Sequence, residues 1–143
     1  MTARPTYDDA NLILRLYDMR REERMRKARA WFTANFKVKS WEDLQKVAPA
    51  GSDENASYRM VVTYWDMVGS FITSGVLNKE LFFESGRELL LVWERMREVL
   101  PIVREQYKDP NLWGHLERVG NDYAATFRTR SAEAYEAFLK RIK

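Results

Sequence analysis

The chain has 143 residues, the usual length of one domain, and is long enough to bury a core without disulfides or a structural metal. Hydrophobic residues make up 45% of the sequence and charged residues 31%, which excludes an intrinsically disordered chain. The absence of cysteine excludes disulfides, thiolate metal ligands and a cysteine nucleophile. We therefore expect one domain over residues 1–143.

The net charge of +3 is unevenly distributed along the chain. Residues 1–40 hold ten Lys and Arg against five Asp and Glu, whereas the remaining residues hold fourteen against sixteen. A basic N-terminal region can attract phosphate or anionic lipid. The sequence shows neither an apolar signal core nor an apolar run near the roughly 20 residues that a membrane span requires. It predicts a cytoplasmic protein without a membrane span.

Two helical patterns are predicted near the N-terminus. Thr6 and Asp9 have the spacing of a capping box, and an apolar stripe follows, made of Leu12, Ile13, Leu16, Tyr17 and Met19. A second stripe covers residues 25–36. Basic side chains fall on the line that joins the two stripes, so we expect a kink or break between Arg20 and Glu23.

The middle of the chain predicts a short helix and a long one. Ser40, with Asp43 three residues later, is typical of an N-cap, and Pro49 lies in the loop that ends this helix. Apolar residues then recur at intervals of three and four over residues 58–72, and Gly75 is the expected C-terminal stop.

The next pattern predicts the longest helix of the core. Asn78 can cap a short helix, which is expected to run through Gly86 into an apolar stripe over residues 89–107, with a bend at Pro101. Gly69 and Gly86 lie on the apolar faces of the two central helices, where a missing side chain permits a close crossing.

Two more helices complete the predicted fold. Pro110 is placed in the first turn of a helix whose stripe covers residues 112–127, and Ser131 caps the last helix. No segment shows the alternation of a strand. The sequence predicts an all-α fold, a compact array of about five to seven helices that is bundle-like around two long central helices.

The basic run over residues 20–29 has two interpretations. On a helix Arg20, Arg24 and Lys27 cluster, whereas the other three basic residues scatter, so the charges make no single stripe. Glu22–Arg26 and Glu23–Lys27 are favourable pairs four residues apart, as on an exposed helix that neutralises itself. The alternative is a site for phosphate, another anion or nucleic acid.

Catalytic signatures are weak. His115 is the only histidine, which excludes a two-histidine metal site. A pair with a serine or a carboxylate stays open, but we expect His115 to be an exposed structural residue. Glu84 and Glu88 have the spacing for a divalent cation or acid–base chemistry, but no Glu-x-x-His motif accompanies them. We expect surface ion pairs with Arg87, Arg95 and Arg97. The sequence predicts no catalytic residue, no cofactor and no metal site.

Residues 58–69, 74–84 and 91–94, together with 16–29, resemble a bacterial family of all-helical domains of unknown function. The similarity covers residues 12 to 118 approximately. Some members of the family carry a membrane anchor ahead of this region, and we expect none in this chain. The resemblance implies an all-helical fold and a bacterial setting, and it brings no catalytic residues.

The leading functional hypothesis is a non-enzymatic module for protein–protein interaction or self-association, as a homo-oligomer, most simply a dimer, or with another protein. Arginine and tryptophan combine contact area with directional polar groups, so the candidate interface is Arg20, Arg24, Lys27 and Trp31. One alternative is a nucleic-acid or anion-binding domain that uses residues 20–29. Another is a divalent-metal carboxylate enzyme that uses Glu84 and Glu88.

Overall fold

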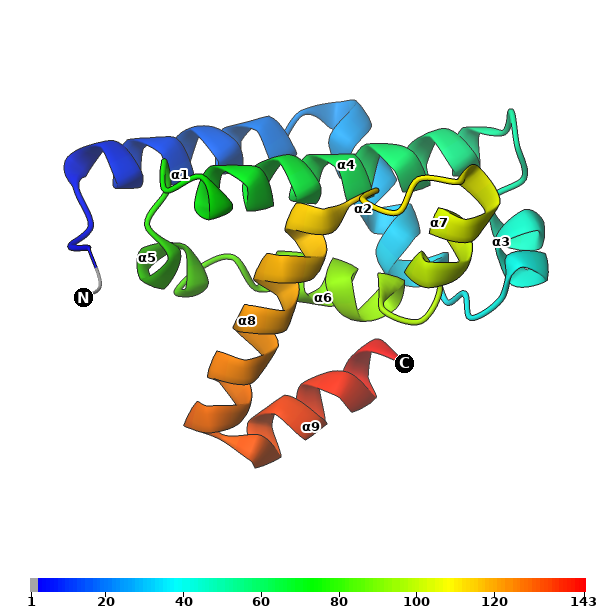
Figure 1. Cartoon of the computed structure of the whole chain (residues 1–143). Helices are drawn as coiled ribbons and strands as arrows, with labels where there is room; N and C mark the ends of the chain where they lie inside the picture. Colours follow the sequence, from blue (N-terminus) through cyan, green and yellow to red (C-terminus); the bar gives the residue numbers. More distant parts are fainter. Residues whose placement is uncertain (1–2) are drawn as a thin grey trace.

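The computed structural model describes residues 3–143, and every regular element in this range is an α-helix (Figure 1). The helices are α1 (Tyr7–Arg20), α2 (Glu23–Asn35), α3 (Trp41–Val47), α4 (Asp53–Thr73), α5 (Lys79–Phe83), α6 (Arg87–Met96), α7 (Leu100–Tyr107), α8 (Gly114–Arg130) and α9 (Ala132–Ile142). The all-α prediction is confirmed. The predicted count of five to seven is wrong, since residues 3–143 form nine helices.

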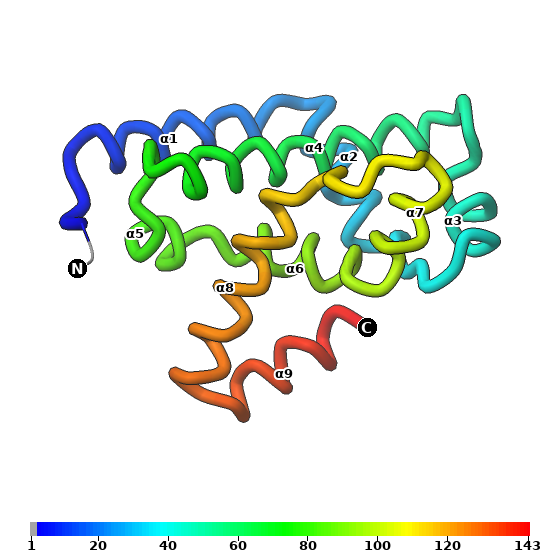
Figure 2. Tube along the Cα trace, in the orientation of Figure 1, coloured from blue at the N-terminus to red at the C-terminus, as the bar shows by residue number. Residues whose placement is uncertain are grey.

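The two longest helices, α4 and α8, organise the core. α4 packs against α2 and α8, and α8 also packs against α6 and α9. Figures 1 and 2 show that α9 turns back after α8 and runs toward the side of α6. None of the helices in the described range is long and apolar enough to cross a membrane.

Short-range capping forms the ends that the sequence predicts. The capping box of Thr6 and Asp9 is present, and the side chains of Ser40, Asn78 and Ser131 each accept a hydrogen bond from a backbone N–H three residues later. Each cap satisfies an amide that would otherwise lack a partner at the start of a helix. The structure confirms these predictions. The sequence could make them because the donor and acceptor of each cap lie within one helical turn.

The predicted break after Arg20 is also confirmed, because α1 ends there and α2 begins at Glu23. Glu22 caps α2: its carboxylate accepts hydrogen bonds from the amides of Arg24 and Met25 at 3.0 and 2.9 Å. These bonds lower the pKa of the Glu22 carboxyl. The capping role replaces the predicted pairing of Glu22 with Arg26.

The predicted long helix over residues 89–107 is instead two helices. α6 ends at Met96 and α7 begins at Leu100, with Pro101 in the first turn of α7. Proline is tolerated in a first turn, where its missing N–H has no helical acceptor, so the chain starts a new helix instead of bending an old one. This break, and a second one at Gly86, account for part of the higher helix count.

The sequence predicted one helix running through Gly86, but α5 and α6 are separate helices on either side of it. Gly86 is the N-cap of α6, and a Cβ placed on it would lie only 2.3 Å from the ring of Phe82. Gly86 therefore makes room for an aromatic ring beside it and does not lie at a crossing of central helices. Gly69 does lie at such a crossing: a Cβ there would be 2.9 Å from the carbonyl oxygen of His115 at the start of α8.

The start of α8 differs from the prediction, because the helix begins at Gly114 and not at Pro110. Trp113 is buried in a left-handed conformation with φ 55° and offers no side-chain cap. Asp66 of α4 supplies the missing acceptor, since its Oδ1 lies 2.9 Å from the amide of Leu116. The residue at which α8 begins therefore depends on a carboxylate that is 50 residues away in the sequence.

Tyr58 is a buried tyrosine of α4 whose hydroxyl has no hydrogen-bond partner in the described residues. Its ring stacks on Phe36 with centroids 4.9 Å apart, and burial raises the pKa of its hydroxyl. A buried hydroxyl without a partner costs free energy, so Tyr58→Phe is expected to stabilise the domain by about 1 kcal/mol.

Urea denaturation can test this expectation, with Tyr123→Phe as the control. The hydroxyl of Tyr123 donates to the carbonyl of Phe83 at 2.7 Å, and its removal should cost about 1 kcal/mol. Equal destabilisation by both substitutions would show that the Tyr58 hydroxyl has a partner in solution, and would contradict the expectation.

Candidate functional site

The four residues of the predicted interface lie on two helices. Arg24, Lys27 and Trp31 share one stripe of α2, whereas Arg20 ends α1. The guanidinium of Arg24 donates to the Ser57 hydroxyl at 3.1 Å. Trp31 is half-buried, and Lys27 is exposed.

The basic run is largely occupied by internal partners. Arg20 and Arg29 face Glu88, Arg24 bonds Ser57, and Lys27 lies 3.2 Å from Glu23, which confirms that predicted pair. Four of the six basic side chains in residues 20–29 therefore have a partner. Only Lys27 pairs within the segment, whereas Arg20 and Arg29 face Glu88 of α6 and Arg24 bonds Ser57 of α4. The self-neutralising interpretation therefore describes one pair, and contacts between helices account for the other three partners.

Glu88 is the centre of a partly buried charged cluster. Arg29 forms a two-pronged ion pair with it, with both N···O distances 2.8 Å, and the indole N–H of Trp65 donates to the same carboxylate at 3.2 Å. Arg20 is 14% exposed, and its Nη1 lies 3.9 Å from Glu88. The cluster ties α1, α2, α4 and α6 together.

The electrostatics of this cluster favour a structural role for Glu88. Its hydrogen bond raises the pKa of the Arg29 guanidinium, which keeps this cation charged beside the carboxylate. Both carboxylate oxygens already accept hydrogen bonds, which leaves little capacity to bind a metal ion. Glu84 faces a different cation, Arg130, at 3.3 Å. The structure therefore does not bring Glu84 and Glu88 together as a pair.

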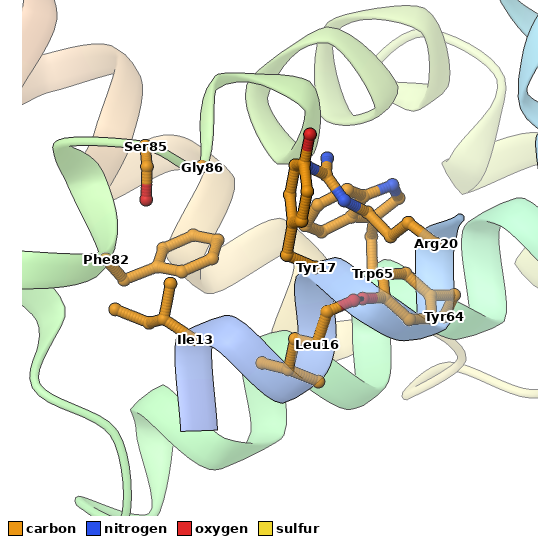
Figure 3. Close-up of a pocket in the computed structure, with 9 residues that line it drawn as sticks. All are labelled: Ile13, Leu16, Tyr17, Arg20, Tyr64, Trp65, Phe82, Ser85 and Gly86. Carbon is orange, nitrogen blue, oxygen red and sulfur yellow. Dashed lines mark hydrogen bonds between the residues drawn. The ribbon is translucent and has the colours of Figure 1, made fainter. Parts of the chain in front are cut away.

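A small cavity of about 100 Å³ adjoins the cluster between α1, α4 and the α5–α6 junction (Figure 3). The Arg20 guanidinium lies by its wall, 5.1 Å from the ring centroid of Tyr17 and 5.3 Å from that of Trp65. Burial raises the pKa of Tyr64, another lining residue, to about 12, so its hydroxyl is neutral and donates to the Leu16 carbonyl. Sites for small molecules usually measure about 300–1,000 Å³, so this cavity is too small to be one.

Helix α1, which lines this cavity, carries most of the exposed large hydrophobic residues of the described chain. Seven large hydrophobic side chains are exposed in residues 3–143, and four of them, Tyr7, Leu14, Tyr17 and Met19, belong to this one helix. At 3.6 residues per turn, the first three lie within about a quarter turn of one another. We call Tyr7, Leu14 and Tyr17 the α1 outer face. Met19 lies on the other flank of the helix.

Sequence reasoning assigned Tyr17 and Met19 to the buried stripe of α1, but both are about half exposed. It did not consider Leu14, which is 63% exposed. The available signal was that Leu14 is a large apolar residue directly opposite the buried Leu16 on the helix. A large apolar residue on the side of a helix that faces away from the core does not contribute to core packing.

A family model described as a domain of unknown function, DUF4760, matches residues 5–123. The chain belongs to this family. The match includes α1 to α7 and most of the length of α8, and it confirms the resemblance to helical domains of unknown function. α9 and the end of α8 follow the matched range. No curated protein and no solved structure matches this DUF4760 chain.

Proposed function

We propose that this DUF4760 domain is a non-enzymatic self-association module that dimerises through the α1 outer face. The observation that supports the proposal is the exposure of Tyr7, Leu14 and Tyr17, at 81%, 63% and 51%, on one side of one helix. Scattered exposed hydrophobic residues are normal, but a group on one face marks a surface that a partner covers.

The charge pattern of α1 favours a second copy as that partner. The exposed Asp8 lies in the first turn and the exposed Arg21 follows the last turn, whereas Asp9 and Arg20 have partners within the chain. An antiparallel pairing centred on Leu14 sets the acidic end of each α1 beside the basic end of the other and opposes the two helix dipoles. The same pairing places Tyr7 of one copy across from Arg21 of the other, where a cation–π contact can form. The arrangement has the two-fold symmetry of most homodimers.

Tyr17 is suited to be an anchor of this interface because it is already held in place. The guanidinium carbons of Arg20 and Arg21 lie 5.1 and 5.9 Å from its ring centroid. A side chain that is ordered before binding loses less conformational entropy when the complex forms. Arg20, a residue of the predicted interface, therefore contributes by positioning Tyr17 more than by direct exposure.

Leu14→Lys is expected to weaken the dimer by roughly 30-fold or more, because it replaces a leucine that the dimer covers and places two like charges at the symmetry axis. Light scattering during size-exclusion chromatography over a dilution series measures this change. Met60→Lys is the control, since Met60 is an exposed apolar residue within α4.

A wild-type protein that stays monomeric at every concentration would refute the proposal, as would a Leu14→Lys dimer as tight as the wild type. The same runs at low and high salt, with absorbance read at protein and nucleic-acid wavelengths, test the alternative of nucleic-acid binding. That alternative predicts co-eluting nucleic acid that is lost as salt rises.

A further inference from the structure

A second hollow lies on a different part of the molecule, between the segment that joins α2 and α3, the end of α6, and α9. Its volume is about 590 Å³, within the range usual for small-molecule sites. Figure 1 shows the end of α9 approaching this side of the structure. We call this hollow the α6–α9 groove.

Part of the groove wall is apolar. Val38 and Tyr135 are 4% exposed, and Leu139 and Ile142 of α9 are half-buried. The positions of Tyr135, Leu139 and Ile142 repeat at four and three residues, so these side chains line one side of α9. Leu139 and Ile142 therefore supply most of the apolar surface that a hydrocarbon chain can contact, with Val38 and Tyr135 packed behind them.

The lining is also strongly cationic. Six basic side chains line the groove: Lys37, Lys39, Arg95, Arg97, Arg128 and Lys143. Only two acidic side chains, Glu94 and Glu98, accompany them. The excess of four positive charges in this one hollow is larger than the net charge of +3 of the whole chain.

Most of this charge is not neutralised internally. Glu94 is occupied by Arg97, at 2.7 Å, and by the hydroxyl of Tyr135. Lys37, Lys39, Arg128 and Lys143 form no ion pair within residues 3–143. A ligand with a negative charge would therefore meet several cations that form no ion pair, and Glu98 is the one lining carboxylate that Arg97 does not occupy.

Arg95 adds a cation that is held rigidly beside the groove. Its guanidinium has five N–H bonds, and four of them donate to the backbone carbonyls of Phe32, Thr33, Phe36 and Ile142. No carboxylate balances its charge among the described residues. The groove thus combines a fixed, partly buried cation with exposed lysines.

We propose that the α6–α9 groove binds a small amphiphilic anion with a carboxylate head and a single acyl chain, the chemistry of a medium-chain fatty acid. The chain lies against Val38, Leu139 and Ile142, and the carboxylate is held by the lysines of the α2–α3 segment. This site is separate from the α1 outer face, so binding does not depend on dimerisation. One wall of the groove lies beyond the residues that match the family.

Isothermal titration of the full chain with decanoate, below its micelle concentration, tests the proposal. We expect one decanoate per chain. Decyltrimethylammonium has the same chain with the opposite charge, and acetate has the same head without a chain. Both are expected to bind at least roughly tenfold more weakly. Equal binding of the cationic amphiphile would overturn the proposal, as would the absence of decanoate binding.

Two variants locate the site. Lys37→Glu with Lys39→Glu is expected to weaken decanoate binding by roughly tenfold or more, and Leu139→Trp, which fills the groove without changing its charge, is expected to abolish it. Arg26→Glu with Lys46→Glu is the control, because it makes the same charge change at exposed residues outside the groove. Circular dichroism melting of each variant verifies that it folds. Unchanged affinity in folded groove variants would contradict the proposal.

Discussion

Gly120→Ala is expected to destabilise the domain by about 3 kcal/mol, although alanine is the better helix former. Gly120 lies inside α8 and faces the ring of Trp93 in α6. A Cβ at this position would be 2.3 Å from Cγ of Trp93, well inside van der Waals contact. One of the two helices must therefore move.

The indole of Trp93 has little freedom to give way. Its side chain is 2% exposed, and its N–H donates to the Asn121 side chain at 3.1 Å. A displacement would break this bond and open space on the far side of the ring, so the cost includes lost packing as well as overlap.

Gly114→Ala is the matched control for this prediction. A Cβ at Gly114, the first residue of α8, has no neighbour within 4 Å, so the substitution should be neutral or stabilise by about 0.5 kcal/mol. Urea denaturation of both variants measures the difference. Equal stability of Gly120→Ala and wild type would mean that α6 and α8 can separate at no cost, contrary to the packing described above.

Arg95→Met is expected to cost about 3 kcal/mol, because one side chain holds the ends of two helices. The Arg95 guanidinium donates to Phe32, Thr33 and Phe36 at the end of α2 and to Ile142 at the end of α9, at distances of 2.7 to 3.2 Å. Burial lowers the pKa of Arg95, but the negative ends of both helix dipoles favour its cation.

We expect Arg95→Met to loosen the end of α9 as well as to lower the free energy of unfolding of the domain. Without Arg95, the end of α9 loses its bond to α6, and hydrogen exchange of α9 amides should become faster than in the wild type. Arg130→Met is the control: the side chains of Arg130 and of its partner Glu84 are each 62% exposed, so its removal should cost less than about 1 kcal/mol. Similar costs for the two variants would contradict the role assigned to Arg95.

Arg95 also shows why the sequence predicted some contacts incorrectly. From the sequence, Arg87, Arg95 and Arg97 were expected to pair with nearby carboxylates, and only Arg97 does so among these three. Arg87 instead lies over the ring of Phe127, 4.2 Å from its centroid. A cation near acidic residues in sequence can still face carbonyls or rings when another helix packs beside it.

The sequence by itself determined the local features of this DUF4760 domain. The spacing of apolar residues predicted an all-helical fold, and Thr6, Ser40, Asn78 and Ser131 predicted helix starts, because a capping side chain and its amide lie within one turn. The break after Arg20 was predictable because the apolar stripes before and after it do not lie on one side of a continuous helix.

The tertiary structure alone decided the features that join distant residues. The start of α8 depends on Asp66, the inward turn of Arg20 depends on Glu88, and the exposure of Leu14 depends on which side of α1 meets the core. The groove exists because α9 folds back against α6. Each of these pairings is set by how helices pack, and residue spacing along one helix carries no information about which surface of another helix it will meet.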